Sequence, residues 1–252
     1  MLEPVLWGLV QGLTEFLPIS SSGHLVLIPE LLGVDAPDLA TTAVLHLGTL
    51  TAVVVYYRGE LVWLAHFRSD TDARRVLTLL VIATLPAIAV LAVEGLIEDV
   101  QASAVAVAWL LVMNGGILFI SGFLRTGSRS LEGGKPWDAI AVGVAQVLAV
   151  FPGLSRSGLT ITAGQARGFQ GTQAARFSFL LSIPVILAAA IIEGAELAGE
   201  GGLAVDVLIA VAVAALAGYA AIAIVLRVVN RYGLRPFAYY CFALAAVALI
   251  AL

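Results

Sequence analysis

Two short stretches decide the fold that this sequence predicts, QGLTEFLPISSSGH at residues 11–24 and QVLAVFPGLSRSGLT at residues 146–160. Each interrupts an apolar segment with a proline, serines and a glycine, and the two align without a gap at an offset of 135 residues. Proline and glycine break helices, and a broken backbone is tolerated at membrane depth only where protein surrounds it. We therefore predict two re-entrant helical hairpins, over residues 4–32 and 137–168, with these motifs at their tips.

The rest of the chain is rich in apolar segments of membrane-spanning length. Hydrophobic residues make up 61% of the 252 residues and charged ones 12%, which is more apolar surface than a soluble core can bury. A helix needs roughly 17 or more apolar residues to cross a hydrocarbon core of ~30 Å. The expected fold is an all-α membrane protein, a single integral-membrane domain over residues 1–252. Its six transmembrane helices are predicted at residues 40–57, 76–93, 100–124, 177–192, 207–226 and 236–252.

The basic residues are concentrated in alternate connections between the predicted helices. Lys and Arg collect in cytoplasmic loops, and nearly all of the 13 basic residues lie in connections at 58–75, 125–136, 167–176 and 227–235. We expect these connections in the cytoplasm and both termini outside, in a multi-pass protein of the cell membrane. Three crossings would then invert the second hairpin, which predicts an inverted internal repeat of residues 1–125 and 136–252. The alternative is chance similarity between two apolar stretches.

The net charge, the single cysteine and the first residues of the chain add three further expectations. A net charge of -4 argues against a nucleic-acid partner. Cys241 is the sole cysteine and cannot form an internal disulfide, so we expect a buried thiol. The first residues lack the basic segment of a cleavable signal peptide, and we expect no removal there.

Three ionisable side chains fall at membrane depth, where such groups are costly and functional by default: Glu15, His24 and Arg156. The guanidinium of Arg156 offers a fork of donors suited to phosphate oxygens, and helix N-termini after the two tips would add backbone N–H groups. The alternative is that Arg156 only forms a structural ion pair with Glu15. The hydroxyl-bearing residues that we expect around the phosphates are Ser20, Ser22, Ser155, Ser157 and Thr160.

Acid and base are supplied by the first tip alone. His24 could take a proton from a serine or a water, and Glu15 could orient that imidazole or bind a divalent ion. Gln11 lies four residues before Glu15 and so on the same helical face. The alternative for His24 is a buried core histidine whose hydrogen bonds are made within the protein and which has no catalytic role. His46 and His66 have no acid or base near them in the sequence, so we expect packing or solvation for both.

The two tips together resemble the undecaprenyl-diphosphate phosphatase family, the bacitracin-resistance type. Its signature Pro-Gly-x-Ser-Arg-Ser-Gly-x-Thr is matched from Pro152 to Thr160, and the similarity runs along essentially the whole chain. The resemblance implies integral-membrane enzymes that remove the terminal phosphate of a polyprenyl diphosphate, regenerating the monophosphate carrier of cell-wall sugars. It also implies a divalent cation, Mg²⁺ or Ca²⁺, held by Glu15 and Gln11, although many members carry Glu in place of Gln11. The catalytic-pocket residues that it implies are Glu15, Ser21, His24, Ser155, Arg156 and Thr160.

The expected reaction places the prenyl tail in membrane lipid and the diphosphate on Arg156. Ser21 would attack the terminal phosphorus while His24, positioned by Glu15, takes the serine proton; attack by an activated water is equally compatible with the sequence. The rival classes are an inverted-repeat transporter or flippase of polyprenyl phosphate and a structural membrane subunit. The oligomeric state stays open, with a homodimer as one option.

Overall fold

The computed structural model describes residues 2–124, 127–197 and 205–252. Within those ranges the regular elements are all helices, joined by turns and loops, and no strand is present. A single isolated bridge joins Arg129 and Phe169. The elements are α1 (Leu2–Phe16), α2 (Ser21–Leu32), α3 (Leu39–Tyr56), α4 (Arg58–Ala65), α5 (Thr71–Thr84), η1 (Leu85–Val93), α6 (Glu94–Gln101), α7 (Ala104–Ser121), η2 (Leu131–Gly133), α8 (Pro136–Leu148), α9 (Arg156–Ala166), α10 (Gly171–Leu197), α11 (Val205–Tyr232) and α12 (Arg235–Ala251).

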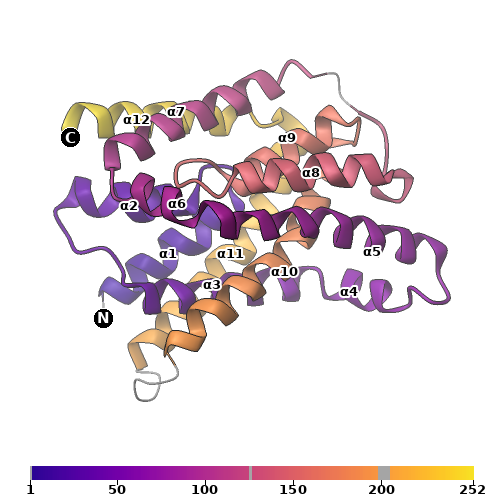
Figure 1. The fold of residues 1–252 in the computed structure, drawn as a ribbon, viewed down its shortest axis with the longest axis horizontal. Coiled ribbons are helices and arrows are strands. Elements are labelled where there is room, and N and C mark those ends of the chain that lie inside the picture. The colour runs from indigo at the N-terminus through magenta and orange to yellow at the C-terminus, as the bar shows by residue number, and fades with distance from the viewer. Residues whose placement is uncertain (1, 125–126, 198–204) are drawn as a thin grey trace.

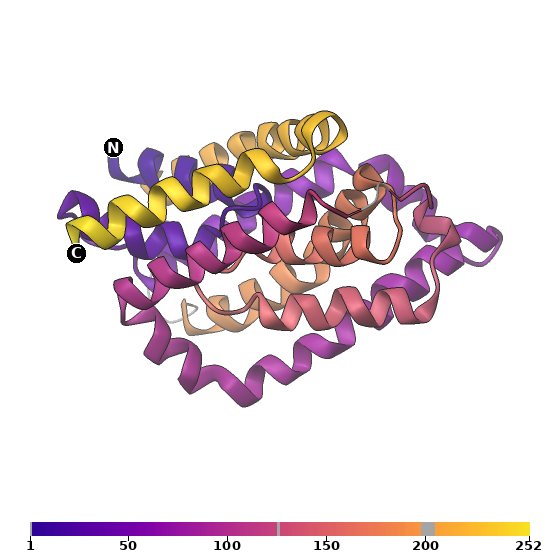
Figure 2. The ribbon, with the colours of Figure 1, turned by 90° about the horizontal axis from the view of Figure 1, so that it is seen from above.

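The helices form one elongated bundle in which both termini lie at the same end (Figures 1 and 2). α11 packs against α1 and α3, α12 lies along α7, and α10 crosses α3 and α9. The turn between α4 and α5 and the start of α8 lie at the end opposite the termini (Figure 1). The large apolar core includes residues of both predicted hairpins, among them Phe16, Leu27, Val142 and Ile161.

Helices of membrane-spanning length and composition are present. Among the described residues, three helical segments meet both criteria, over Ala104–Ser121, Gly171–Ala189 and Asp206–Tyr232. Three shorter apolar helices cover Thr41–Tyr56, Pro136–Leu148 and Arg235–Ala251. The predicted all-α membrane architecture is confirmed at this level.

The predicted span at residues 76–93 is not one α-helix. α5 ends at Thr84, and the chain continues as the 3₁₀ segment η1 before α6 begins. Pro86 stands at the second position of η1, and a proline removes one backbone N–H and clashes with the preceding helical turn. The expectation of an uninterrupted helix here was wrong because hydropathy alone does not register that break.

The basic connections are also shorter than expected. α11 continues through Arg227 and Arg231 to Tyr232, so the predicted connection at residues 227–235 is mostly the helix end. Arg176 likewise belongs to α10, where it forms ion pairs with Glu60 and Glu132. Long arginine side chains let a helix run past the apolar zone while their charged ends reach polar surroundings.

Each tip helix begins with the same cap. The hydroxyl oxygen of Ser20 accepts the N–H of Gly23 at 3.2 Å, and that of Ser155 accepts the N–H of Gly158 at 3.1 Å. A serine at the N-cap satisfies one of the N–H groups that a helix start leaves without a partner. The two caps are 135 residues apart, at matching positions of the two motifs.

The two tips touch. The N–H of Gly153 donates to the hydroxyl of Ser20 at 3.0 Å, and the hydroxyl of Ser157 donates to the Leu17 carbonyl at 3.2 Å. Gly153 has a φ of 100°, and a side chain at Gly23 would lie 3.1 Å from the Gly153 Cα. Small residues are therefore required where the turn after α1 meets the turn after α8.

Candidate active site

The carboxylate of Glu15, one residue before the end of α1, is the centre of a polar cluster. It accepts the Gln11 amide at 3.0 Å and the Ser21 hydroxyl at 2.7 Å. It also forms an ion pair with Arg156 of α9. The pair that the sequence left open as a structural alternative is thus present, and it joins the two tips.

Arg156 is the first residue of α9 and keeps unused donor capacity. Its side chain is 16% exposed, and one guanidinium nitrogen, Nη2, donates to Glu15. A guanidinium has five N–H donors. Because the described residues give the guanidinium no other side-chain partner, its remaining N–H groups can donate to additional anionic oxygens. A phosphate would compete with Glu15 for the same cation.

The hydroxyl of Ser20 is committed to structure. Ser20 is 2% exposed, its φ is 70°, and its oxygen accepts from both Gly23 and Gly153. Ser22 lies 3.4 Å from it, hydroxyl to hydroxyl, and faces the cavity described below. Of these two predicted phosphate ligands, Ser22 is the one that the fold leaves accessible.

The hydroxyls of the second tip are likewise occupied. Ser155 and Ser157 are bonded to each other at 3.1 Å, and Ser157 donates to the Leu17 carbonyl. Thr160 is 1% exposed and is bonded to the Ser178 hydroxyl at 2.7 Å. We expected these side chains to face phosphate, and the structure instead uses them to hold the tip together. Buried hydroxyls must be bonded within the protein, and the sequence does not reveal their partners.

His24 does not contact Glu15, contrary to our expectation. Its Nδ1 lies 2.7 Å from the Ser20 carbonyl oxygen, and its Nε2 lies 2.8 Å from the hydroxyl of Tyr240 on α12. Both ring nitrogens are therefore engaged elsewhere, while the Glu15 carboxylate is taken by Gln11, Ser21 and Arg156. Ser21 lies on the Glu15 side of α2 and His24 on the side that faces α12.

Asn114 of α7 links the tips and was missed from the sequence. Its side chain is 0% exposed. Its amide nitrogen donates to the Pro18 carbonyl at 3.1 Å and to the sulfur of Cys241 at 3.4 Å, and its oxygen accepts the Ser155 N–H at 3.0 Å. An asparagine inside an otherwise apolar span was the available signal, because polar side chains in membrane helices bond to other helices.

A cavity of about 780 Å³ opens beside the cluster, at the end of the bundle that carries the termini. Ser21 and Ser22 line it together with the loop after α2, which ends where Asp38 caps α3. Hydrogen bonds from Thr41 lower the pKa of Asp38, so this cap stays ionised. Its lining includes Gln11, Ser21, Ser22, Leu25, Val26, Pro29, Glu30, Asp35, Asp38, Thr42, His46 and Gln101.

His46 is half-buried and lines this cavity, a position between the packing and the solvation that the sequence predicts for it. It lines the wall formed by α3 and lies close enough to Glu15 to interact with its charge. The sequence placed no acid within one helical turn of His46, and only the packing of α3 against α1 brings the two together.

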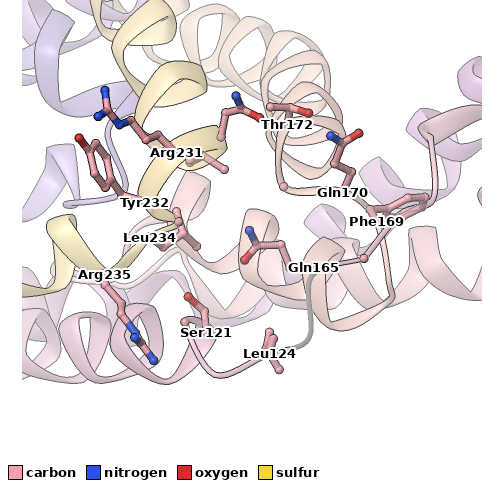
Figure 3. Close-up of a pocket in the computed structure, with 16 residues that line it drawn as sticks. Ser121, Leu124, Gln165, Phe169, Gln170, Thr172, Arg231, Tyr232, Leu234 and Arg235 are labelled. Atoms are coloured by element: carbon pink, nitrogen blue, oxygen red, sulfur yellow. The ribbon is translucent and has the colours of Figure 1, made fainter.

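A second cavity, of about 440 Å³, lies among the ends of α7, α9, α11 and α12 (Figure 3). Gln165 points toward its middle, whereas the guanidinium groups of Arg231 and Arg235 point away from it (Figure 3). None of the predicted site residues lines it. The first cavity is therefore the candidate active site.

The residues present fit a divalent cation only together with a substrate. Glu15 offers one carboxylate, and the Gln11 side-chain oxygen is buried without a hydrogen-bond partner among the described residues. No group of three or more metal-binding His, Cys, Asp or Glu side chains occurs in that part of the chain. Mg²⁺ commonly uses one or two protein oxygens, with the remaining positions supplied by water and substrate phosphates. Gln11 and Glu15 meet that requirement.

Comparison with known proteins places this geometry in context. Residues 4–247 match the family described as bacitracin resistance protein BacA. The chain is 43% identical to the undecaprenyl-diphosphatase of Rubrobacter xylanophilus, with 98% of this chain and 96% of that protein covered. It is 42% identical to the undecaprenyl-diphosphatase of Syntrophotalea carbinolica, over 95% and 94%. Undecaprenyl-diphosphatase 2 of Stutzerimonas stutzeri is 40% identical, over 99% and 97%.

Proposed function

The chain belongs to the BacA family, and we infer that it is an undecaprenyl-diphosphatase, a membrane hydrolase that converts undecaprenyl diphosphate to the monophosphate lipid carrier. One observation carries the chemistry: the Ser21 hydroxyl, which lines the cavity, is bonded to the Glu15 carboxylate, and that carboxylate is ion-paired with the Arg156 guanidinium of the other tip. A transporter or flippase is not favoured, because its anion clamp would need no carboxylate bonded to a serine hydroxyl.

Arg156 is the anchor for the diphosphate in this proposal. Its fork binds oxygens of the terminal phosphate and neutralises charge that develops as the phosphoryl group is transferred. Binding of the phosphate loosens its pairing with Glu15, and the carboxylate is then free to act on a proton. The apolar lining residues Leu25, Val26 and Pro29 accommodate the first prenyl units.

Ser21 is the proposed nucleophile and Glu15 its base. The Ser21 hydroxyl lies 2.7 Å from the carboxylate, so its proton passes to Glu15 as the oxygen–phosphorus bond forms. The bond between phosphorus and the bridging oxygen breaks, and undecaprenyl phosphate leaves. Water, whose proton His24 takes in this proposal, then hydrolyses the phosphoserine. Glu15 returns its proton to the Ser21 oxygen, and inorganic phosphate is released. Direct attack by a water bonded to Glu15 is the alternative, and trapping of phosphoserine at Ser21 separates the two routes.

A divalent cation, Mg²⁺ or Ca²⁺, completes the proposed site. When bound, it supplies positive charge to the diphosphate oxygens. Gln11 and Glu15 are the residues that would hold it, since the Gln11 side-chain oxygen is buried and unbonded within the described part of the chain. The Gln11 amide, which donates to Glu15 at 3.0 Å, keeps the carboxylate on the cavity side of α1.

We also propose six membrane spans, two re-entrant hairpins and an inverted repeat over residues 1–125 and 136–252. The matching serine caps 135 residues apart support the repeat. The common end of the two termini supports an even number of crossings, and basic connections at the opposite end support an outside location of the cavity mouth (Figure 1). A homodimer stays a prediction.

The test is phosphate release from undecaprenyl diphosphate in detergent, where no second compartment exists for transport. The wild type should release phosphate, and Arg156→Ala and Ser21→Ala should each lose about 100-fold or more in rate. Arg68→Ala and Ser69→Ala, in the exposed turn after α4, are the matched controls and should behave as wild type. A folded wild type without phosphate release, or an Arg156→Ala variant of full activity, would refute the proposal.

A further inference from the structure

The protonation pattern of His24 follows from its two contacts. Its Nδ1 is 2.7 Å from the Ser20 carbonyl oxygen, and a carbonyl can only accept a hydrogen bond. Nδ1 must therefore carry the proton. In a neutral imidazole the other nitrogen, Nε2, then has the lone pair, and it can act as a base.

Nε2 meets Tyr240. The phenol oxygen lies 2.8 Å from Nε2, and because that nitrogen has no proton to give, the Tyr240 hydroxyl is the donor. The two rings are nearly parallel, at an interplanar angle of 6° and a centroid distance of 5.6 Å. Stacking and the hydrogen bond together hold the plane of the imidazole from the side of α12.

We infer that Tyr240 is a positioning residue for the proposed phosphatase reaction, acting through His24. Its hydroxyl and the Ser20 carbonyl hold His24 as the Nδ1–H tautomer, which makes Nε2 the nitrogen that exchanges protons. His24 is 1% exposed while Tyr240 is 45% exposed. Any group that reaches Nε2 must therefore replace the phenol hydroxyl. The inference rests on the proposed function, since it adds to the same reaction a residue that acts through His24.

Among the groups around His24, Tyr240 is the one bonded to Nε2, so it determines the protonation of that nitrogen. Asn114 of α7 and Cys241 of α12 lie beside the pair, but Asn114 donates to the Pro18 carbonyl and to the Cys241 sulfur. Tyr239 and Cys241 are the titratable neighbours of Tyr240 along α12, and neither is bonded to the His24 ring. Within the described residues no charged side chain is bonded to the His24 ring.

The first arm of the test is Tyr240→Phe, which removes the hydroxyl and keeps the ring. Phosphate release from undecaprenyl diphosphate should fall about five- to tenfold in kcat with KM unchanged, as expected for loss of one hydrogen bond to a working base. The acidic limb of the pH profile should move to higher pH, because the phenol no longer stabilises the neutral imidazole. Tyr239→Phe is the matched control and should behave as wild type, since Tyr239 packs its ring on Phe119 and is 60% exposed.

The second arm reads the tautomer without substrate. In ¹⁵N-histidine-labelled protein, the His24 signals, assigned by their loss in His24→Gln, should show a protonated Nδ1 and an unprotonated Nε2. Tyr240→Phe should move the Nε2 signal and Tyr239→Phe should not. An Nε2–H tautomer in the wild type, or full activity and an unmoved pH profile in Tyr240→Phe, would overturn the inference. If the wild type releases no phosphate at all, the proposed function fails while this arm still reports on the contact.

Discussion

Replacement of Asn114 by alanine is the sharpest test of how the two tips are held together. The side chain bonds to the Pro18 carbonyl of the first tip and to the Ser155 N–H of the second, at 3.1 and 3.0 Å. Asn114→Ala leaves the buried Ser155 N–H without a partner and leaves the Pro18 carbonyl only the long contact from the Cys241 thiol at 4.0 Å. An unmet buried group costs about 1–3 kcal/mol, which gives roughly 2–6 kcal/mol if both groups are counted as unmet. Interhelical hydrogen bonds in membrane proteins contribute only about 0.6 kcal/mol on average. We therefore expect the loss in free energy of unfolding to lie at the lower end of this range, about 2 kcal/mol.

The effect on activity should exceed the effect on stability. The Ser155 N–H precedes Arg156 directly, and a displacement of about 1 Å at a reacting group can cost about 100-fold in rate. We expect Asn114→Ala to lower phosphate release by about that factor and to reduce the melting temperature in detergent. Ser121→Ala is the matched control, because Ser121 is also buried on α7 but donates only to the Leu118 carbonyl of its own helix. Equal activity and melting temperature in Asn114→Ala and Ser121→Ala would refute the reasoning.

Three more outcomes are expected. Gly153→Ala should destabilise the tip, because φ is 100° and the new Cβ would lie 2.5 Å from the Val107 carbonyl oxygen. Gly116→Ala on α7 enters open space inside a helix and should leave the melting temperature unchanged or raise it. Equal melting temperatures of the two variants would contradict this. Burial raises the pKa of Glu132, but hydrogen bonds from Arg176 outweigh it and hold that pKa below 4.5. The contribution of the Glu132–Arg176 pair to stability is therefore complete above pH 4.5 and is lost as the pH falls through the lowered pKa of Glu132. Glu132→Gln should remove this part of the acid sensitivity when melting temperatures are compared at neutral pH and at about pH 4. The same acid sensitivity in wild type and variant would count against it. EDTA should abolish phosphate release and Mg²⁺ or Ca²⁺ should restore it, while full activity after chelation would remove the cation from the proposal.

Much of the site could be predicted because charge is expensive at membrane depth. Glu15 and Arg156 stood out in apolar surroundings, and the paired motifs predicted that their tips would meet. The partners could not be predicted in the same way. A serine next to a histidine in a motif suggests that they react together, yet Ser21 bonds to Glu15 while His24 bonds to a tyrosine 216 residues further on. Neighbours in sequence can face different sides of one helix, and only packing determines which side meets which partner.

The amino-acid sequence by itself determined the helical membrane class, the two broken tips, the family and the charged residues of the candidate site. Each depends on local composition or on spacing along the chain, which hydropathy and motif matching read directly. The tertiary structure decided the role of each polar group: hydroxyls of Ser20, Ser155 and Thr160 hold the tips, His46 enters the cavity, and Asn114 ties both tips to α7. The physical reason is that a buried polar group must find a partner, and that partner comes from whichever helix packs against it.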